Sequence, residues 1–139
     1  MKKFLFLLVL FLLIGCNKNE VEGIKIGNTL IENQTYSENQ NLIKLIENVL
    51  LLDSNSLSAL INFNCGEAAG CYDLGSVITQ IIYKIGEERF MEMTNHLKES
   101  EKSLLKGFIE VGLEYGFPLD GKSKNERVEN EFPIIYKNI

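Results

Sequence analysis

Residues 73–86 read DLGSVITQIIYKIG and carry the most regular apolar pattern in the chain. Six aliphatic side chains recur at the i, i+3, i+4, i+7, i+8 and i+11 spacing that places them on one face of an α-helix; they are Leu74, Val77, Ile78, Ile81, Ile82 and Ile85. Asp73 offers an N-cap, and Gly86 offers a C-terminal stop. We therefore expect this helix to form the centre of the core.

Two more helices are predicted on the N-terminal side of this stretch, the second shorter than the first. Ser37 and Gln40 form a capping-box pattern ahead of apolar residues at helical spacing, which predicts a helix over about 38–52. Residues 53–56 end that helix and offer caps for a second one, which carries Leu57, Leu60, Ile61 and Phe63. So short a connection favours an antiparallel helix pair.

Two further helices are predicted on the C-terminal side, over about 87–98 and from Ser100 to Gly116. Gly112 falls on the apolar side of the last helix, where close approach by another helix would explain it. The charged residues 119–131 predict a loop. The apolar residues 132–136 are expected to dock on the body, because soluble proteins rarely leave a contiguous apolar patch exposed to water.

The predicted fold class is therefore all-α. We expect a small antiparallel bundle of about five helices over residues 37–139, with a cysteine-closed loop between the second and third. Residues 17–36 mix polar side chains with scattered aliphatic ones, which is typical of a flexible tether.

The N-terminus has the pattern of an export signal. Two lysines precede an apolar run over residues 4–14, which is too short for a confident transmembrane helix. The next feature, Leu13-Ile14-Gly15-Cys16, resembles the lipobox of bacterial lipoproteins. The alternatives are an uncleaved short anchor and an ordinary secreted protein in which Cys16 is incidental.

The resemblance implies cleavage between Gly15 and Cys16 and lipid attachment to Cys16, so that residues 1–15 are a signal peptide and 16–36 a lipidated tether. The membrane is then a partner through the lipid on Cys16. Asn17 stands where some enteric bacteria place an aspartate for inner-membrane retention, so the resemblance favours the outer membrane. The folded part would lie in the cell envelope, outside the cytoplasm.

Once Cys16 is assigned to lipid, Cys65 and Cys71 remain as a pair. An exported domain meets an oxidising compartment, where such a pair forms a disulfide. Two free buried thiols are the alternative. The spacing excludes a CxxC redox centre, and the single histidine, His96, leaves too few ligands for zinc. We therefore predict no metal and no cofactor.

The charge of the chain makes nucleic acid an unfavourable partner. The formal net charge is −5, and removal of residues 1–15 with their two lysines makes it −7 for the remaining 124 residues. No basic cluster is present, and binding to phosphate backbones depends on one. A cationic partner would suit the charge better, although solubility alone also accounts for it.

The sequence holds no GxSxG, P-loop or HExxH motif, so we predict that the protein is not an enzyme. The carboxylates of Glu67 and Asp73 flank the cysteine loop, where a loop position and a helix cap explain them more simply than acid–base catalysis. The loop from Phe63 to Tyr72 is rich in small residues, and we expect it to carry recognition, with Phe63, Glu67 and Tyr72 as its residues.

These features predict a membrane-tethered lipoprotein with a binding or structural role in the bacterial envelope and an unknown protein partner. One alternative is an immunity or inhibitor protein that neutralises a toxin in the envelope. An envelope hydrolase is an alternative of another class, which the lack of a nucleophile motif disfavours.

Overall fold

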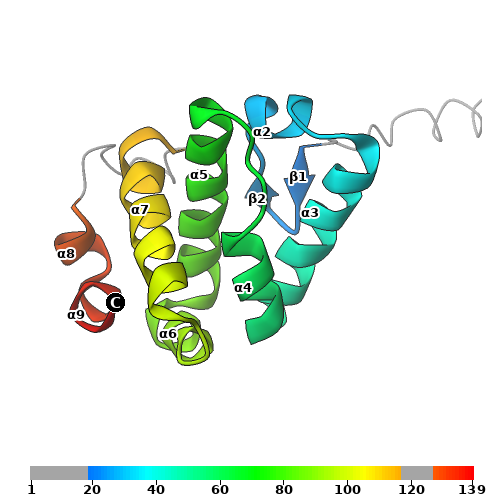
Figure 1. Cartoon of the computed structure of the whole chain (residues 1–139). Coiled ribbons are helices and arrows are strands. Elements are labelled where there is room, and N and C mark those ends of the chain that lie inside the picture. The colour runs from blue at the N-terminus through cyan, green and yellow to red at the C-terminus, as the bar shows by residue number, and fades with distance from the viewer. Residues whose placement is uncertain (1–18, 117–126) are drawn as a thin grey trace, which may run out of the picture.

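A computed structural model of the protein describes residues 19–116 and 127–139 (Figure 1). The predicted all-α fold is confirmed, and the five helices of seven residues or more, α3 to α7, are those predicted from the sequence. A two-stranded antiparallel hairpin and short terminal helices complete it. The elements are β1 (Glu20–Val21), β2 (Ile24–Lys25), α2 (Asn28–Glu32), α3 (Tyr36–Leu50), α4 (Ser54–Ile61), α5 (Ala68–Ile85), α6 (Glu87–Thr94), α7 (Glu99–Tyr115), α8 (Val128–Glu131) and α9 (Pro133–Asn138).

Helix α5 occupies the centre of the fold, as the apolar pattern predicts. It packs against α7 on one side and against α2, β2 and α3 on the other (Figure 1). Of the six aliphatic residues predicted to lie on one face of this helix, five are buried. The sixth, Ile85, is half-buried where the helix ends at Gly86. The core helix was thus predictable from periodicity alone.

Helices α5 and α7 meet backbone to backbone at Gly75 and Gly112. A Cβ atom built on Gly75 would lie 2.5 Å from the carbonyl oxygen of Phe108, and one built on Gly112 would overlap the carbonyl of Gly75. Both positions are therefore restricted to glycine by the closeness of the opposite helix. The close approach predicted from Gly112 is confirmed.

The prediction of a flexible tether is wrong for residues 19–36, which fold against α5. The strands β1 and β2 and the helix α2 place four side chains in the core, namely Val21, Ile24, Ile26 and Leu30. The alternation of Ile24 and Ile26 is too weak a signal to predict the hairpin, because a pair of strands this short forms only against a larger body. Residues 16–18 lie outside the described residues.

The buried side chain of Gln80 fastens this hairpin to α5. Its Oε1 accepts a hydrogen bond from the Lys25 amide (2.9 Å), and its Nε2 donates to the Lys25 carbonyl (2.9 Å). The amide group thus pairs with β2 as a neighbouring strand would. Further along, the Lys84 ammonium donates to the Glu22 carbonyl, so the hairpin follows α5 toward its C-terminal end.

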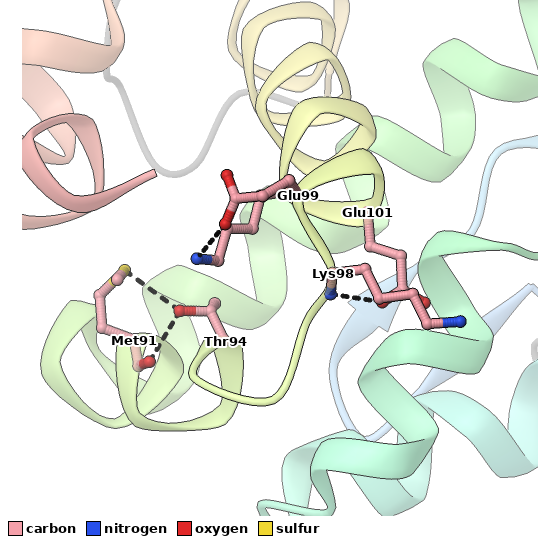
Figure 2. Close-up of polar contacts among 6 residues, drawn as sticks. Met91, Thr94, Lys98, Glu99 and Glu101 are labelled. Carbon is pink, nitrogen blue, oxygen red and sulfur yellow. Dashed lines mark hydrogen bonds and ion pairs between the residues drawn. The ribbon is translucent and has the colours of Figure 1, made fainter.

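Three helix starts differ from the sequence prediction. Helix α3 begins after Thr35, which forms a capping box with Glu38, instead of after Ser37. Helix α5 begins at Ala68, five residues before the predicted cap Asp73. Helix α7 begins after Lys98, instead of after Ser100, with the Glu101 side chain returning to the Lys98 amide (Figure 2).

The apolar C-terminal segment docks on the body, as predicted. Phe132 and Ile135 are buried, and the Phe132 ring contacts the Tyr83 ring with centroids 4.9 Å apart. A carboxylate oxygen of Glu87 accepts hydrogen bonds from the Ile134 and Ile135 amides, at 2.8 and 3.1 Å. Glu87 therefore caps α9 from α6. Residues 128–131, predicted as loop, form α8, and 117–126 lie outside the described residues.

The carboxylate of Glu101 joins α4 to α7. Its Oε1 accepts hydrogen bonds from Ser58 Oγ (2.6 Å) and Asn62 Nδ2 (2.8 Å). Its Oε2 accepts from the Lys98 amide (2.8 Å), the contact drawn in Figure 2. The hydrogen bond from Ser58 is the main cause that lowers the pKa of Glu101, and the Lys98 amide adds to it.

Replacing Gly112 with alanine should destabilise the fold, because the new methyl group has no room beside the Gly75 carbonyl. We expect a loss of about 1–3 kcal/mol in the free energy of unfolding, measured by urea denaturation with far-UV circular dichroism. Gly107→Ala is the matched control, since no atom lies within 4 Å of its Cβ position. That variant should gain up to about 1 kcal/mol from helix propensity. Equal effects of the two substitutions would contradict the close contact.

The lowered pKa of Glu101 predicts a pH-dependent contribution to stability. Between the lowered pKa of Glu101 in the native state and its ordinary value in the unfolded state, the unfolded chain binds a proton that the native protein does not. The free energy of unfolding therefore rises with pH in that range. The advantage of the wild type over Glu101→Gln should be full above about pH 4.3, the ordinary glutamate value, and fall away as the pH drops through the lower native pKa. Urea denaturation at neutral and acidic pH measures it. Glu99→Gln, at an exposed carboxylate of the same turn, is the control. An advantage that does not change with pH would contradict the role of the carboxylate.

Candidate functional site

The disulfide between Cys65 and Cys71 closes the loop that joins α4 to α5, with the two Cα atoms 4.9 Å apart. Cys65 lies in the loop, whereas Cys71 lies in the first turn of α5. Gly66 has a φ of +76°, and its amide donates to Asn64 Oδ1 (3.1 Å). The bond encloses seven residues, which corresponds to about 2 kcal/mol of stabilisation in the chain-entropy account. The loop is therefore a fixed part of the surface.

The turn between α2 and α3 packs against this loop. Gln34 Nε2 donates to the Asn64 carbonyl (2.7 Å), and the Asn33 side chain lies beside Gly66 and Gly70. Gly70 is buried, and a Cβ atom there would overlap the Cys65 carbonyl. Two segments about 30 residues apart in the sequence thus form one surface.

Asp73 caps α2 instead of the helix that carries it. Its Oδ2 accepts a hydrogen bond from the Leu30 amide (3.0 Å), at the start of α2. The N-cap position of α2 is Gly27, and a Cβ atom there would overlap the Asp73 carboxylate. Helix α2 has no acidic residue in its own first turn, so Asp73 supplies the negative charge that its N-terminus favours.

Two tyrosines stack beside the loop. The rings of Tyr72 on α5 and Tyr115 on α7 have centroids 4.8 Å apart and planes that differ by 14°. They remain 39% and 56% exposed. The neighbouring Glu114 carboxylate, which hydrogen-bonds the phenol, is the main cause that raises the pKa of Tyr115 above its usual value.

These features gather at one end of the molecule, which we call the disulfide end and define as residues 28–36, 62–73 and 112–116. Figure 1 shows α2, the start of α5 and the end of α7 side by side at the top of the view. The start of α3 lies at the same end, where Tyr36 is 81% exposed. Three exposed tyrosines from three helices therefore lie at the end of the molecule that carries the disulfide-closed loop.

The structure separates the three residues predicted for recognition. Glu67 is exposed at the N-cap position of α5, with no side-chain cap bond, and Tyr72 is exposed in the tyrosine stack. Phe63 is half-buried and packs against the core, so it supports the loop from beneath. A recognition role for these residues stays a prediction, and Cys16 lies outside the described residues.

Sequence reasoning missed Tyr115 and Tyr36 as surface residues. Tyr115 follows Phe108 and Val111 at the i+7 and i+4 spacing of one helix face, but it occupies the last turn, beyond the part of α7 that the bundle covers. Tyr36 was assigned to the tether. The available signal for Tyr115 was its place between Glu114 and Gly116, because a charged neighbour and a helix stop are typical of an exposed helix end.

The described residues contain no group of three or more His, Cys, Asp and Glu side chains that could hold a metal ion. His96 is exposed at the corner between α6 and α7. One shallow apolar hollow lies between α7 and the C-terminal helices, and another hollow, beside Gly86, is lined by Glu87, Glu88 and Arg89. Neither lies at the disulfide end.

Among residues 19–116 and 127–139, no helix has the length and apolarity needed to cross a membrane. Comparisons with protein-family models, with curated proteins and with solved structures gave no match for this chain. Arguments about function therefore depend on its own residues.

Reduction of the disulfide should lower the free energy of unfolding by about 2 kcal/mol, because the unfolded chain regains the freedom of the seven-residue loop. Urea denaturation of the wild type with and without dithiothreitol measures the change. The double variant Cys65→Ala/Cys71→Ala is the control, since the reductant should leave its stability unaltered. A wild type that does not respond to dithiothreitol would show that the two thiols are not joined.

Proposed function

We propose that this chain is a bacterial lipoprotein whose helical domain is held at a membrane of the cell envelope, outside the cytoplasm, and acts there as a binding module. The resemblance of Leu13-Ile14-Gly15-Cys16 to a lipobox is the starting point. The disulfide of the folded domain is the structural observation that carries the proposal. Structural disulfides persist in oxidising compartments and are rare in the cytosol.

The cysteine inventory agrees with this assignment. The chain has three cysteines, and Cys65 and Cys71 are bonded to each other. Cys16 is the one that remains, and it stands at the lipid-accepting position of the motif. A thiol at that position suits thioether formation with a diacylglyceryl group, and cleavage before it frees an amino group for a further acyl chain.

The anchor would be strong enough to hold the domain permanently. Each buried methylene contributes about 0.8 kcal/mol, and a single acyl chain holds a protein only reversibly. The two chains of a diacylglyceryl group exceed that limit. Asn17 after the lipidated cysteine favours the outer membrane over the inner one, by the same resemblance.

A binding role suits the described surface better than catalysis. The carboxylates nearest the core, Asp73, Glu87 and Glu101, are each occupied in capping helices or joining them. The disulfide end, by contrast, offers a fixed loop with exposed tyrosines, which combine large apolar area with a polar tip. Such a surface suits contact with a protein or with a membrane better than it suits catalysis.

A second candidate, an immunity or inhibitor protein, is favoured by the corner between α3 and α4. Leu51 and Leu52 are 80% and 43% exposed there, and Leu52 has a φ of +66°, which is uncommon for a residue other than glycine. Adjacent apolar side chains held outward in a strained turn suit a protein partner. Recovery of a cationic toxin domain with the native protein from envelope extracts would support this candidate.

Lipidation is tested on the protein from its own host. Mass spectrometry should find a chain that begins at Cys16 and carries the mass of a diacylglyceryl group, and the protein should partition into the detergent phase of Triton X-114. Cys16→Ala should abolish the added mass and move the protein to the aqueous phase. Cys65→Ala/Cys71→Ala is the matched control and should partition as the wild type does. An amino terminus without added lipid would overturn the proposal.

A further inference from the structure

The described residues begin three positions after the proposed lipid attachment site. Only Asn17 and Lys18 separate Cys16 from Asn19, the first described residue. An extended chain spans at most about 3.6 Å per residue, so the Cα atoms of Cys16 and Asn19 lie no more than about 11 Å apart. The part of the body at Asn19 then stays within about a nanometre of the lipid attachment site.

Asn19 belongs to the rigid body. Its carbonyl accepts a hydrogen bond from the Ile26 amide (2.8 Å), and its side chain donates to Asn28 Oδ1 (2.6 Å) at the start of α2. The strand that follows pairs with β2, which Gln80 fastens to α5. The attachment point therefore has a defined place on the surface.

That place is near the disulfide end. The hairpin follows α5 from the level of Asp73, where α2 is capped, to the level of Lys84, where the hairpin turn is held. Asn19, bonded to Asn28, lies at the Asp73 level, and Figure 1 shows the chain entering β1 at the end that carries α2. Helix α5 has 18 residues and is about 27 Å long, so the opposite end exceeds the reach of the tether.

The side chains at this end suit a membrane interface. Tyr36, Tyr72 and Tyr115 are exposed there on three different helices. Tyrosine is enriched at membrane–water interfaces, where its ring lies among the headgroups and its hydroxyl stays hydrated. The exposed leucines of the α3–α4 corner lie at the other end (Figure 1).

Resting on the proposed lipidation of Cys16, we propose that the disulfide end is the membrane-facing surface of the protein, with Tyr36, Tyr72 and Tyr115 in contact with lipid headgroups. The opposite end, with Leu51 and Leu52, then points away from the membrane toward any protein partner. The short chain to Cys16 sets this orientation, and the tyrosines stabilise it.

Exposed carboxylates at the disulfide end determine which lipid headgroups this end can contact. Glu32, Glu67 and Glu114 are exposed there, and they repel anionic headgroups over about 8 Å at physiological salt. The acyl chains outweigh this repulsion, because their burial does not depend on headgroup charge. The contact therefore forms most fully on zwitterionic lipid, and phosphatidylcholine is the lipid for the test.

The chain contains no tryptophan, so single tryptophans can report the orientation. Lipidated Tyr36→Trp and Tyr115→Trp proteins, purified from host membranes, are reconstituted in phosphatidylcholine vesicles with and without brominated lipid. Leu51→Trp is the matched control at the opposite end. We expect several-fold stronger quenching, together with a blue-shifted emission, for the two disulfide-end variants. Circular dichroism and the acyl mass are recorded on each sample.

An insertion variant tests the short attachment. A Gly-Ser spacer of about a dozen residues inserted between Lys18 and Asn19 adds a reach of about 20 Å and should lower the quenching of Tyr36→Trp. Acylated samples in which Leu51→Trp is quenched as strongly as the other two would overturn the orientation and leave the lipoprotein assignment intact. Samples without acyl mass would overturn the lipoprotein assignment, and the orientation with it.

Discussion

The direct backbone contact between α5 and α7 is the constraint on which the rest of the fold depends. Gly75 and Gly112 bring the two helix backbones into direct contact, so the helices fit together there in one relative position. Tyr72 lies one turn before Gly75, and Tyr115 lies one turn after Gly112. In an antiparallel pair these positions meet, and the tyrosine stack follows from the glycine contact. The helix pair at the centre thus determines what the disulfide end presents.

Acidic side chains connect the peripheral segments to this centre. Asp73 on α5 caps α2, Glu87 on α6 caps α9, and Glu101 on α7 joins α4. Each spans at least 39 positions of sequence and satisfies backbone amides or side-chain donors that would otherwise lack a partner. These three carboxylates therefore have structural roles.

How much the sequence could predict depends on how far apart in the chain the interacting residues lie. The stripe from Leu74 to Ile85 is a local periodic signal, and Gly112 was informative because it interrupts an apolar face. Asp73 was misassigned, because its local context suits a cap for the helix that follows, whereas its partner, Leu30, is 43 residues away. Gln80 could not be recognised for a similar reason, because the pairing of its side chain with β2 leaves no periodic pattern in the sequence.

The candidate site was predicted in part for the same reason. The disulfide and the exposed Tyr72 follow from residues close together in the chain, whereas the contribution of Tyr115 and of the α2–α3 turn arises only from packing. Two overlapping capping patterns, Thr35 with Glu38 and Ser37 with Gln40, were equally compatible with the start of α3. The structure uses the earlier pattern, Thr35 with Glu38, together with the docked hairpin that places α2 directly before α3.

The disulfide also bears on how the domain matures. Three cysteines allow three pairings, and the proposed acylation of Cys16 would leave a single one. The two remaining thiols are six positions apart, so they meet as soon as the segment emerges, before distant helices assemble. Oxidative folding of such a chain requires an oxidant but no isomerase, because no wrong intramolecular bond exists to be corrected.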